Sequence, residues 1–198
     1  WWSAFTASGR DFATELPPDV PMRERLLQVL DDVSVLIKAQ QAVEGGVLAG
    51  YPYHLGYVRD QYGTHRGLVA LEHEEMSRDI LRFYFNVFQA NGRINNAQAF
   101  GIPGLLHVHE NDDVEITGYI SFQAFDYLAR SGDMDFVKQI FPMLEWAWMA
   151  QQGHFIKDML PFNGDETYVA GGILPRSALN DGSAEATMLF IESGRQLI

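Results

Sequence analysis

The sequence predicts an all-α protein assembled from helical hairpins. Apolar residues recur at helical spacing through most of the 198 residues. Glycine or asparagine follows several of these segments, where a left-handed residue ends a helix. The pattern that begins at Arg59 returns at Glu115, at an offset of roughly sixty residues. Repeats of this kind predict stacked hairpins, as an open solenoid or a closed toroid.

The first predicted helix covers residues 22–42. Pro21 suits the start of a helix, because its missing N–H group costs nothing in the first turn. Gly45 and Gly46 end the segment, and residues 47–57 are expected to form a loop or a short strand. The apolar residues of this helix share one face: Leu26, Leu27, Leu30, Val33, Leu36 and Ile37.

Five further helices are predicted, over residues 59–72, 76–90, 115–129 and 134–151 and from Ser183 onward. Gly92 and Gly132 end helices of the two hairpins, and Asp181 or Ser183 caps the last helix. The long loops, residues 93–113 and 153–179, carry aromatic and acidic side chains. They fall on one side of the repeat, as a concave active-site face requires.

The composition excludes several classes of function. The net charge of −12 disfavours nucleic acid and anionic membranes as partners, because both bind basic surfaces. The chain has no cysteine, which excludes disulfides, thiol catalysis and cysteine-ligated metals. No apolar run has the length of a transmembrane helix. A single domain with a sizeable core fits this length.

Both ends of the sequence have the pattern of internal positions. Trp1 follows no initiator methionine or basic leader, and the residues up to Ile198 have the pattern of a helix. We therefore expect residues 1–198 to be part of a longer catalytic domain. No residue pattern assigns a compartment, and a soluble cytoplasmic protein is the expectation.

The first candidate site is the segment Tyr57-Val58-Arg59-Asp60 at the start of a predicted helix. Asp60 suits this position as a partner for free N–H groups of the first turn. A functional reading assigns Arg59 and Asp60 to sugar hydroxyls, since a guanidinium donates a planar fork. The aromatic residues just before the segment, which include Tyr53, favour the functional reading.

The second candidate site is the segment from Asn163 to Tyr168, which sets Asp165 and Glu166 on a glycine turn. Asn-Gly-Asp is ordinary turn chemistry. An acid beside aromatic side chains can also protonate a leaving group when burial raises its pKa. We expect an active-site role for this loop, with Glu166 ahead of Asp165 as the general acid.

The histidines give a weaker indication of a functional site than these two segments. His107 and His109 alternate as two ligands on one side of a strand do, but no further histidine follows at a suitable spacing. A substrate-lining loop is therefore favoured over a metal site. His65, His73 and His154 stand alone in the sequence and are expected at the surface or satisfied in the core.

The order of these motifs resembles the start of the catalytic domain of glucoamylase-type six-hairpin glycoside hydrolases. The resemblance rests on residues 34–39, residues 45–50, the Tyr57-Val58-Arg59-Asp60 segment and residues 175–184. It covers most of the chain. The family has an aromatic residue next to paired glutamates, whereas this chain has Gly-Asp-Glu-Thr-Tyr, so Asp165 competes with Glu166 for the role of the acid.

The resemblance implies an (α/α)6 toroid, of which about half is present, with the active site in a funnel of loops. It implies an exo-acting, inverting hydrolase of oligo- or polysaccharides. Glu166 would be the general acid, with the catalytic base in the other half of the toroid and no cofactor or metal. The substrate-binding candidates are Tyr53, Tyr57, Arg59, Asp60, His109, Tyr168 and Arg176.

Half a toroid exposes apolar helix faces, so we expect either the missing C-terminal half or self-association to cover them. Two alternative functions remain open. One is a phosphorylase on the same toroid, which would depend on phosphate. The other is a non-catalytic helical-repeat protein that binds carbohydrate.

Overall fold

The computed structural model describes residues 1–50, 54–101, 112–161 and 182–198. It is mostly helical, with 66% of the described residues in helix, which confirms the predicted class in its coarse form. A small two-stranded sheet departs from the all-α prediction. The described helices are α1 (Trp2–Thr6), α2 (Phe12–Glu15), α3 (Arg23–Gln40), α4 (Val58–Ala70), α5 (Glu74–Asn91), α6 (Asp112–Ser131), α7 (Met134–Met149) and α8 (Ala184–Leu197), with a 3-10 turn at Gln152–His154.

Each of the six predicted helices is present as one of the helices from α3 to α8. Ser183 is the predicted N-cap of α8, and its hydroxyl accepts a hydrogen bond from the backbone N–H of Ala186 at 3.2 Å. Gly92 ends α5 in the left-handed conformation, with a φ of 68°. The strand β1 (Leu55–Tyr57) lies within residues 47–57, where a loop or a short strand was expected. The strand β2 (Ala97–Ala99) and the short helices α1 and α2 were not predicted.

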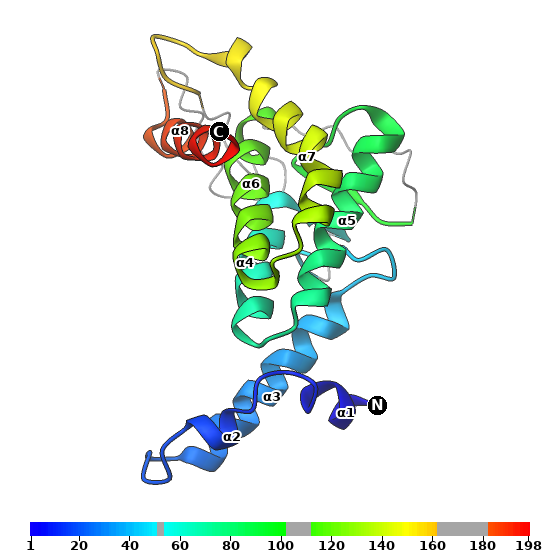
Figure 1. Ribbon diagram of the computed structural model, residues 1–198, viewed down its shortest axis with the longest axis vertical. Coiled ribbons are helices and arrows are strands. Elements are labelled where there is room, and N and C mark those ends of the chain that lie inside the picture. The colour runs from blue at the N-terminus through cyan, green and yellow to red at the C-terminus, as the bar shows by residue number, and fades with distance from the viewer. Residues whose placement is uncertain (51–53, 102–111, 162–181) are drawn as a thin grey trace, which may run out of the picture.

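Two antiparallel hairpins form the body of the protein (Figure 1). A short turn at residues 71–73 joins α4 to α5, and Gly132 with Asp133 joins α6 to α7. The Asp133 carboxylate accepts from the N–H of Phe136 at 3.1 Å and so caps α7. These connections confirm the predicted hairpins, whereas their place in a toroid stays a prediction.

The core lies between the four helices of these hairpins. Side chains such as Ile80, Ile120 and Leu144 are completely buried there. Their burial supplies the main stabilising term of the fold, about 1.5–3 kcal/mol for each large apolar side chain. Along the described helices, none is long and apolar enough to cross a membrane.

Helix α8 packs across α6 and α7 at the opposite end from the N-terminus (Figure 1). Gly118 of α6 lies against Leu189, and the indole N–H of Trp148 donates to the carbonyl of Phe190 at 3.2 Å. The N–H of Ser183 donates to the carbonyl of Leu160 at 2.6 Å. Helix α8 therefore helps to fix both ends of the segment that contains residues 162–181.

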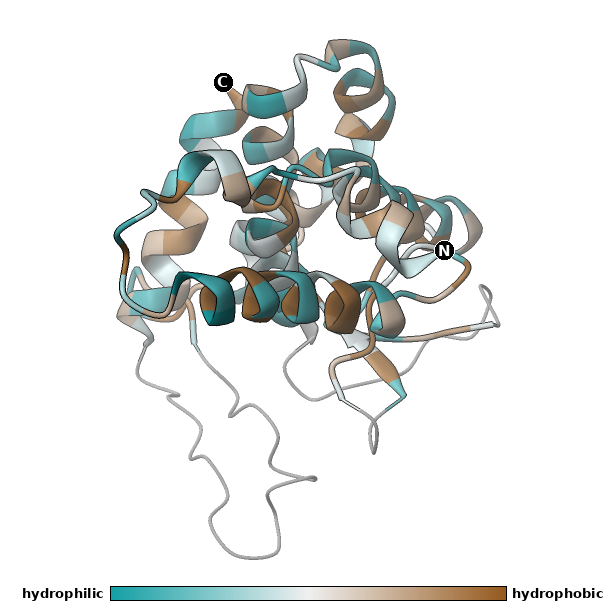
Figure 2. Ribbon diagram, turned by 90° about the horizontal axis from the view of Figure 1, so that it is seen from below, coloured by the Kyte–Doolittle hydropathy of each residue, from teal (hydrophilic) through white to brown (hydrophobic). Residues whose placement is uncertain are grey.

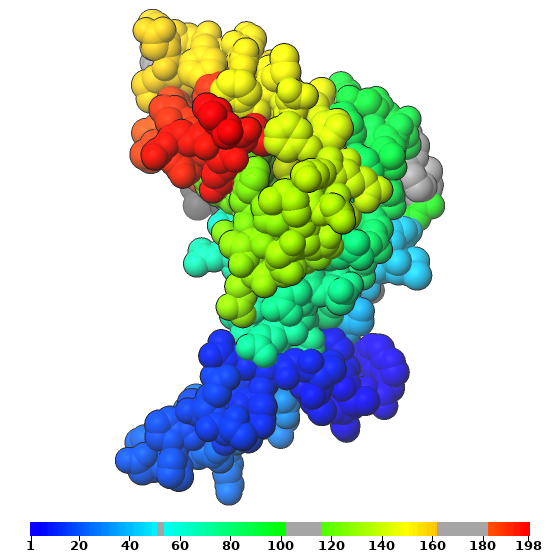
Figure 3. Space-filling model, in the orientation of Figure 1, coloured from blue at the N-terminus to red at the C-terminus, as the bar shows by residue number. Residues whose placement is uncertain are grey.

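Helix α3 extends from the body together with α1 and α2, as an arm (Figures 1 and 3). The sequence pattern had placed all the apolar residues of this helix on one face. In the structure they do not all face the body. Leu27, Leu30 and Ile37 are partly buried, whereas a second row at heptad spacing is exposed. Figure 2 colours the ribbon by hydropathy and shows hydrophobic and hydrophilic residues alternating along the helices. The exposed row consists of Met22 (66% exposed), Leu26 (41%), Val29 (47%), Val33 (40%) and Leu36 (62%).

Candidate functional site

Arg59 and Asp60 lie in the first turn of α4, directly after strand β1. The strand pairs antiparallel with β2, with Leu55 opposite Ala99. The N–H of Val58 donates to the carbonyl of Asn96 at 2.9 Å, so the pairing continues into the helix start. The sheet therefore fixes the backbone from which Arg59 and Asp60 project.

Two buried polar side chains, Tyr84 and Gln61, hold the junction between β1 and α4 in place. The hydroxyl of Tyr84 donates to the carbonyl of Gly56 at 3.1 Å, and Gln61 bonds both the N–H and the carbonyl of Val47. Tyr84 and Gln61 are completely buried. Burial raises the pKa of the Tyr84 phenol well above its usual range, and the nearby charge of Asp60 adds to the effect.

Close packing explains why Gly45 and Gly46 occupy the turn that follows α3. A Cβ atom on Gly46 would lie 2.6 Å from the ring of Phe100, and one on Gly45 would lie 2.3 Å from the carbonyl oxygen of Asp79. Gly45 also has a φ of 105°, which a residue with a side chain adopts only with strain. The glycines quoted for the family resemblance thus have a packing role in this chain.

The four residues of the first candidate site differ in exposure. Tyr57 is 5% exposed and belongs to the core. Arg59 is partly buried and Asp60 is exposed at the surface. Arg59 and Asp60 are therefore more accessible than Tyr57, which packs in the core beneath them.

The remaining predicted site residues lie outside the described part of the chain. They are Tyr53, His109, Asp165, Glu166, Tyr168 and Arg176. The β1–β2 pairing places His54, just before β1, and Gly101, just after β2, at the same edge of the sheet. Arg59 follows the other end of β1, where Tyr57 pairs with Ala97.

A second group of polar residues was not predicted. His65 of α4 is completely buried, and its Nδ1 atom contacts the hydroxyl of Ser77 on α5. Its Nε2 atom lies 4.0 Å from the carboxylate of Asp126 on α6, which also accepts from the hydroxyl of Tyr62 at 3.3 Å. Three different helices supply this group, so no spacing in the sequence could have indicated it.

Burial sets the chemistry of this group. Desolvation lowers the pKa of His65 to about 4, and the charge of Arg66 lowers it further, so the ring is neutral at pH 7. Ser77 is also completely buried. Its hydroxyl is therefore closed to a substrate, and the serine, histidine and aspartate do not form a nucleophilic triad.

The sequence prediction for His65 was right about burial in the core, but Nε2 has no hydrogen-bond partner among the described residues. A buried polar atom without a partner costs about 1–3 kcal/mol. Among the same residues, no group of three histidines, cysteines or acids is arranged to hold a metal ion.

No protein-family model matches the chain, and neither a curated protein nor a solved structure matches it. The resemblance to glucoamylase-type enzymes therefore rests on the quoted motifs. A functional assignment has to be argued from those motifs and from the geometry around Arg59 and Asp60.

Proposed function

We propose that this chain belongs to a glycoside hydrolase that cleaves oligo- or polysaccharides, with inversion and from a chain end. The observation that carries the proposal is the fixed position of Arg59 and Asp60 in the first turn of α4, directly after the two-stranded sheet of a helical hairpin bundle. The proposal includes an (α/α)6 toroid as the complete fold and Glu166 as the general acid, with Asp165 as the competing candidate.

The chemistry of the two side chains suits a sugar. Arg59 offers donors in a planar fork, and Asp60 offers two acceptor oxygens, so neighbouring hydroxyls of one ring can bond to both. Both project from a backbone that β2, Tyr84 and Gln61 hold in place. A rigid base reduces the entropy that binding costs.

Arg59→Ala is expected to weaken oligosaccharide binding about 10-fold or more, because hydrogen bonds to charged groups contribute about 1.5–3 kcal/mol. Arg82→Ala is the matched control, since Arg82 lies on the surface of α5 and pairs with Asp79 at 3.2 Å. Titration of each folded variant with maltooligosaccharides, followed by NMR, measures the effect. Equal affinities for the two variants would contradict the binding role of Arg59.

Glu166→Gln in the full-length protein tests the catalytic part of the same proposal. The change keeps the shape of the side chain but removes its acid, so sugar release is expected to fall about 10²–10⁴-fold while binding persists. Asp165→Asn tests the competing candidate, since it should keep its turnover if Glu166 is the acid and lose it if Asp165 is. Release of a sugar phosphate only when phosphate is added would favour a phosphorylase, and binding without turnover would favour a carbohydrate-binding protein.

We also propose that the exposed row on α3 pairs with a second copy of the chain. An antiparallel pairing that sets Leu26 opposite the partner's Val29 also brings Arg25 next to the partner's Asp32. One alignment of the two helices therefore brings apolar residues opposite apolar residues and an arginine next to an aspartate. Because α3 extends from the body (Figure 3), an antiparallel pairing would direct the two bodies to opposite ends of the helix pair.

Leu26→Lys is expected to turn the dimer into a monomer, because it places a charge in the centre of the pairing. Met188→Lys is the matched control, since Met188 on α8 is 63% exposed and lies outside the row. Sedimentation equilibrium measures the oligomeric state of both variants. Arg25→Asp should weaken the dimer and Arg25→Asp with Asp32→Arg should restore it. A monomeric unmodified chain, or a dimer that survives Leu26→Lys, would refute the pairing.

A further inference from the structure

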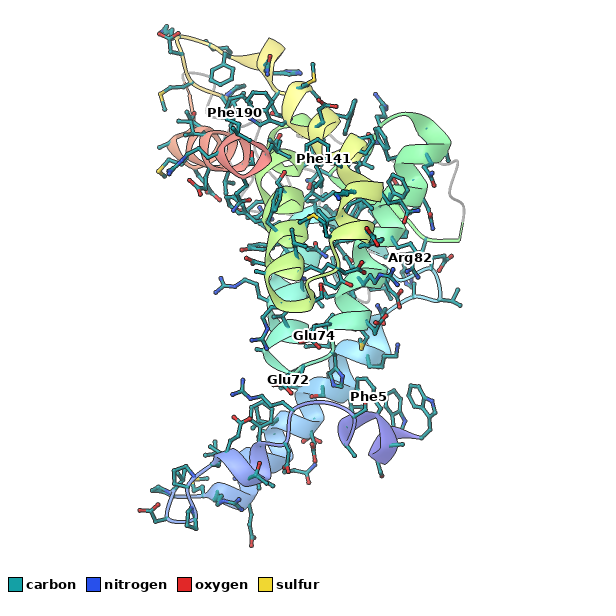
Figure 4. All side chains as sticks on the ribbon, viewed as in Figure 1. Phe5, Glu72, Glu74, Arg82, Phe141 and Phe190 are labelled. Carbon is teal, nitrogen blue, oxygen red and sulfur yellow. The ribbon has the colours of Figure 1, made fainter. Side chains whose placement is uncertain are left out.

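A cavity of about 340 Å³ lies where the N-terminal segment meets the C-terminal ends of α4 and α6. The segment is attached to the body at this level. Phe5 stacks on His73 with ring centroids 4.4 Å apart, and the N–H of Arg10 donates to the carbonyl of Leu71 at 2.9 Å. Figure 4 shows Phe5 close to Glu72 and Glu74 at this junction. The cavity is lined by Arg10, His65, Arg66, Val69, Ala70, Asp126, Ala129 and Arg130.

The cavity is lined by more arginines than acids although the protein is acidic. Its lining holds three arginines and one aspartate, in a chain of net charge −12. Arg10 is bound by Glu15, with 2.6 Å between nitrogen and oxygen, and Arg130 lies 3.9 Å from Glu74. Arg66 is exposed and forms no ion pair with any described residue. One cation at the cavity is therefore available to a ligand.

His65 adds a second, independent sign of a ligand. Its side chain is completely buried, lines the cavity and directs Nε2 toward Asp126, yet this atom has no partner among the described residues. A neutral ring next to a carboxylate favours the tautomer with hydrogen on Nε2, while Ser77 donates its hydroxyl hydrogen to Nδ1. This unused donor lies in the wall of the cavity, 4.0 Å behind the acceptor oxygens of Asp126.

We propose that this cavity binds a small carboxylate with a neighbouring hydroxyl group, the chemistry of a uronic acid or a hydroxy acid. The carboxylate pairs with Arg66, and the hydroxyl donates to the half-exposed carboxylate of Asp126. The inference does not rest on the proposed glycosidase site. Arg59 and Arg66 lie seven residues apart, or about 10 Å along the axis of α4.

Charge decides between a carboxylate and a phosphate. A phosphate dianion would have to draw Arg10 or Arg130 away from Glu15 or Glu74, because only Arg66 is unpaired. The C-terminal ends of α4 and α6 also lie at this junction, and their partial negative charge opposes a dianion more than a monoanion. A single carboxylate therefore fits the cavity better.

Calorimetric titration with glucuronate, glucose and inorganic phosphate tests the proposal. Glucose and glucuronate differ at one carbon, so their comparison isolates the carboxylate. We expect glucuronate to bind at least 10-fold more tightly than glucose or phosphate. Arg66→Gln should remove this advantage, whereas Arg25→Gln, which changes an exposed arginine of α3, should leave it unchanged.

The role of the hydroxyl has its own test. Asp126→Asn should reduce the preference for glucuronate over acetate, because acetate has no hydroxyl to donate to Asp126. Equal binding of glucose and glucuronate, tighter binding of phosphate, or full glucuronate affinity in Arg66→Gln would each overturn the proposal.

Discussion

Gly118→Ala is expected to destabilise the protein by about 1–3 kcal/mol, the range for adding a group to a packed core. Gly63→Ala is expected to stabilise it by about 0.5–1 kcal/mol, because alanine is the better helix former. Both glycines lie inside helices, Gly118 in α6 and Gly63 in α4. Urea unfolding of the two variants and the unmodified protein measures both signs.

The surroundings of the two glycines explain the opposite signs. A Cβ atom on Gly118 would lie 2.5 Å from the Cβ atom of Leu189, while one on Gly63 would meet nothing within 4 Å. The Cβ atom of Leu189 is fixed to the backbone of α8, so no rotation of the side chain relieves the contact. Helix α8 has to move away from α6. Stabilisation by both substitutions would show that α8 does not pack this closely.

The contact at Gly118 also matters for the proposed function. The start of α8 is tied to Leu160 through Ser183, and residues 162–181 lie between these two positions in the chain. A displaced α8 therefore moves one end of the segment that contains Glu166. This links the packing of a buried glycine to the loop that we propose carries the general acid.

The helices could be predicted because their signals are local. Ser183 and Gly92 act within one turn, and the periodicity of apolar residues needs only a few neighbours. The same periodicity could not tell which side of α3 is covered. It grouped Leu26 with Leu27 on one face, whereas contact with the rest of the chain leaves Leu26 exposed and Leu27 partly buried.

Features that depend on distant residues could not be predicted. Each strand of the sheet has three residues, and Leu55 pairs with Ala99 far along the chain. Tyr57 was interpreted as a residue that contacts substrate, because aromatic side chains in a loop often do. The sheet instead draws it into the core. The surroundings of His65 come from three helices, which no spacing rule connects.

His65 is expected to make the protein sensitive to mild acid. Its pKa is about 4 in the folded protein, against about 6.5 in an unfolded chain. The unfolded state therefore binds the proton more readily, and stability falls as the pH drops below about 6.5. The loss approaches about 3 kcal/mol near pH 4 and is absent above pH 7, because one pKa unit corresponds to about 1.4 kcal/mol.

His65→Gln removes the titrating group, so the variant should lose less stability than the unmodified protein between about pH 6.5 and pH 4. His154→Gln is the control, because His154 is exposed in the 3-10 turn. Denaturant unfolding at several pH values measures the difference. Burial also lowers the pKa of His73, and this contribution stays in both variants. The carboxylates titrate in both variants, so their effect on stability cancels in the comparison. If the stability of His65→Gln and His154→Gln changed with pH in the same way, His65 would not be the buried neutral group.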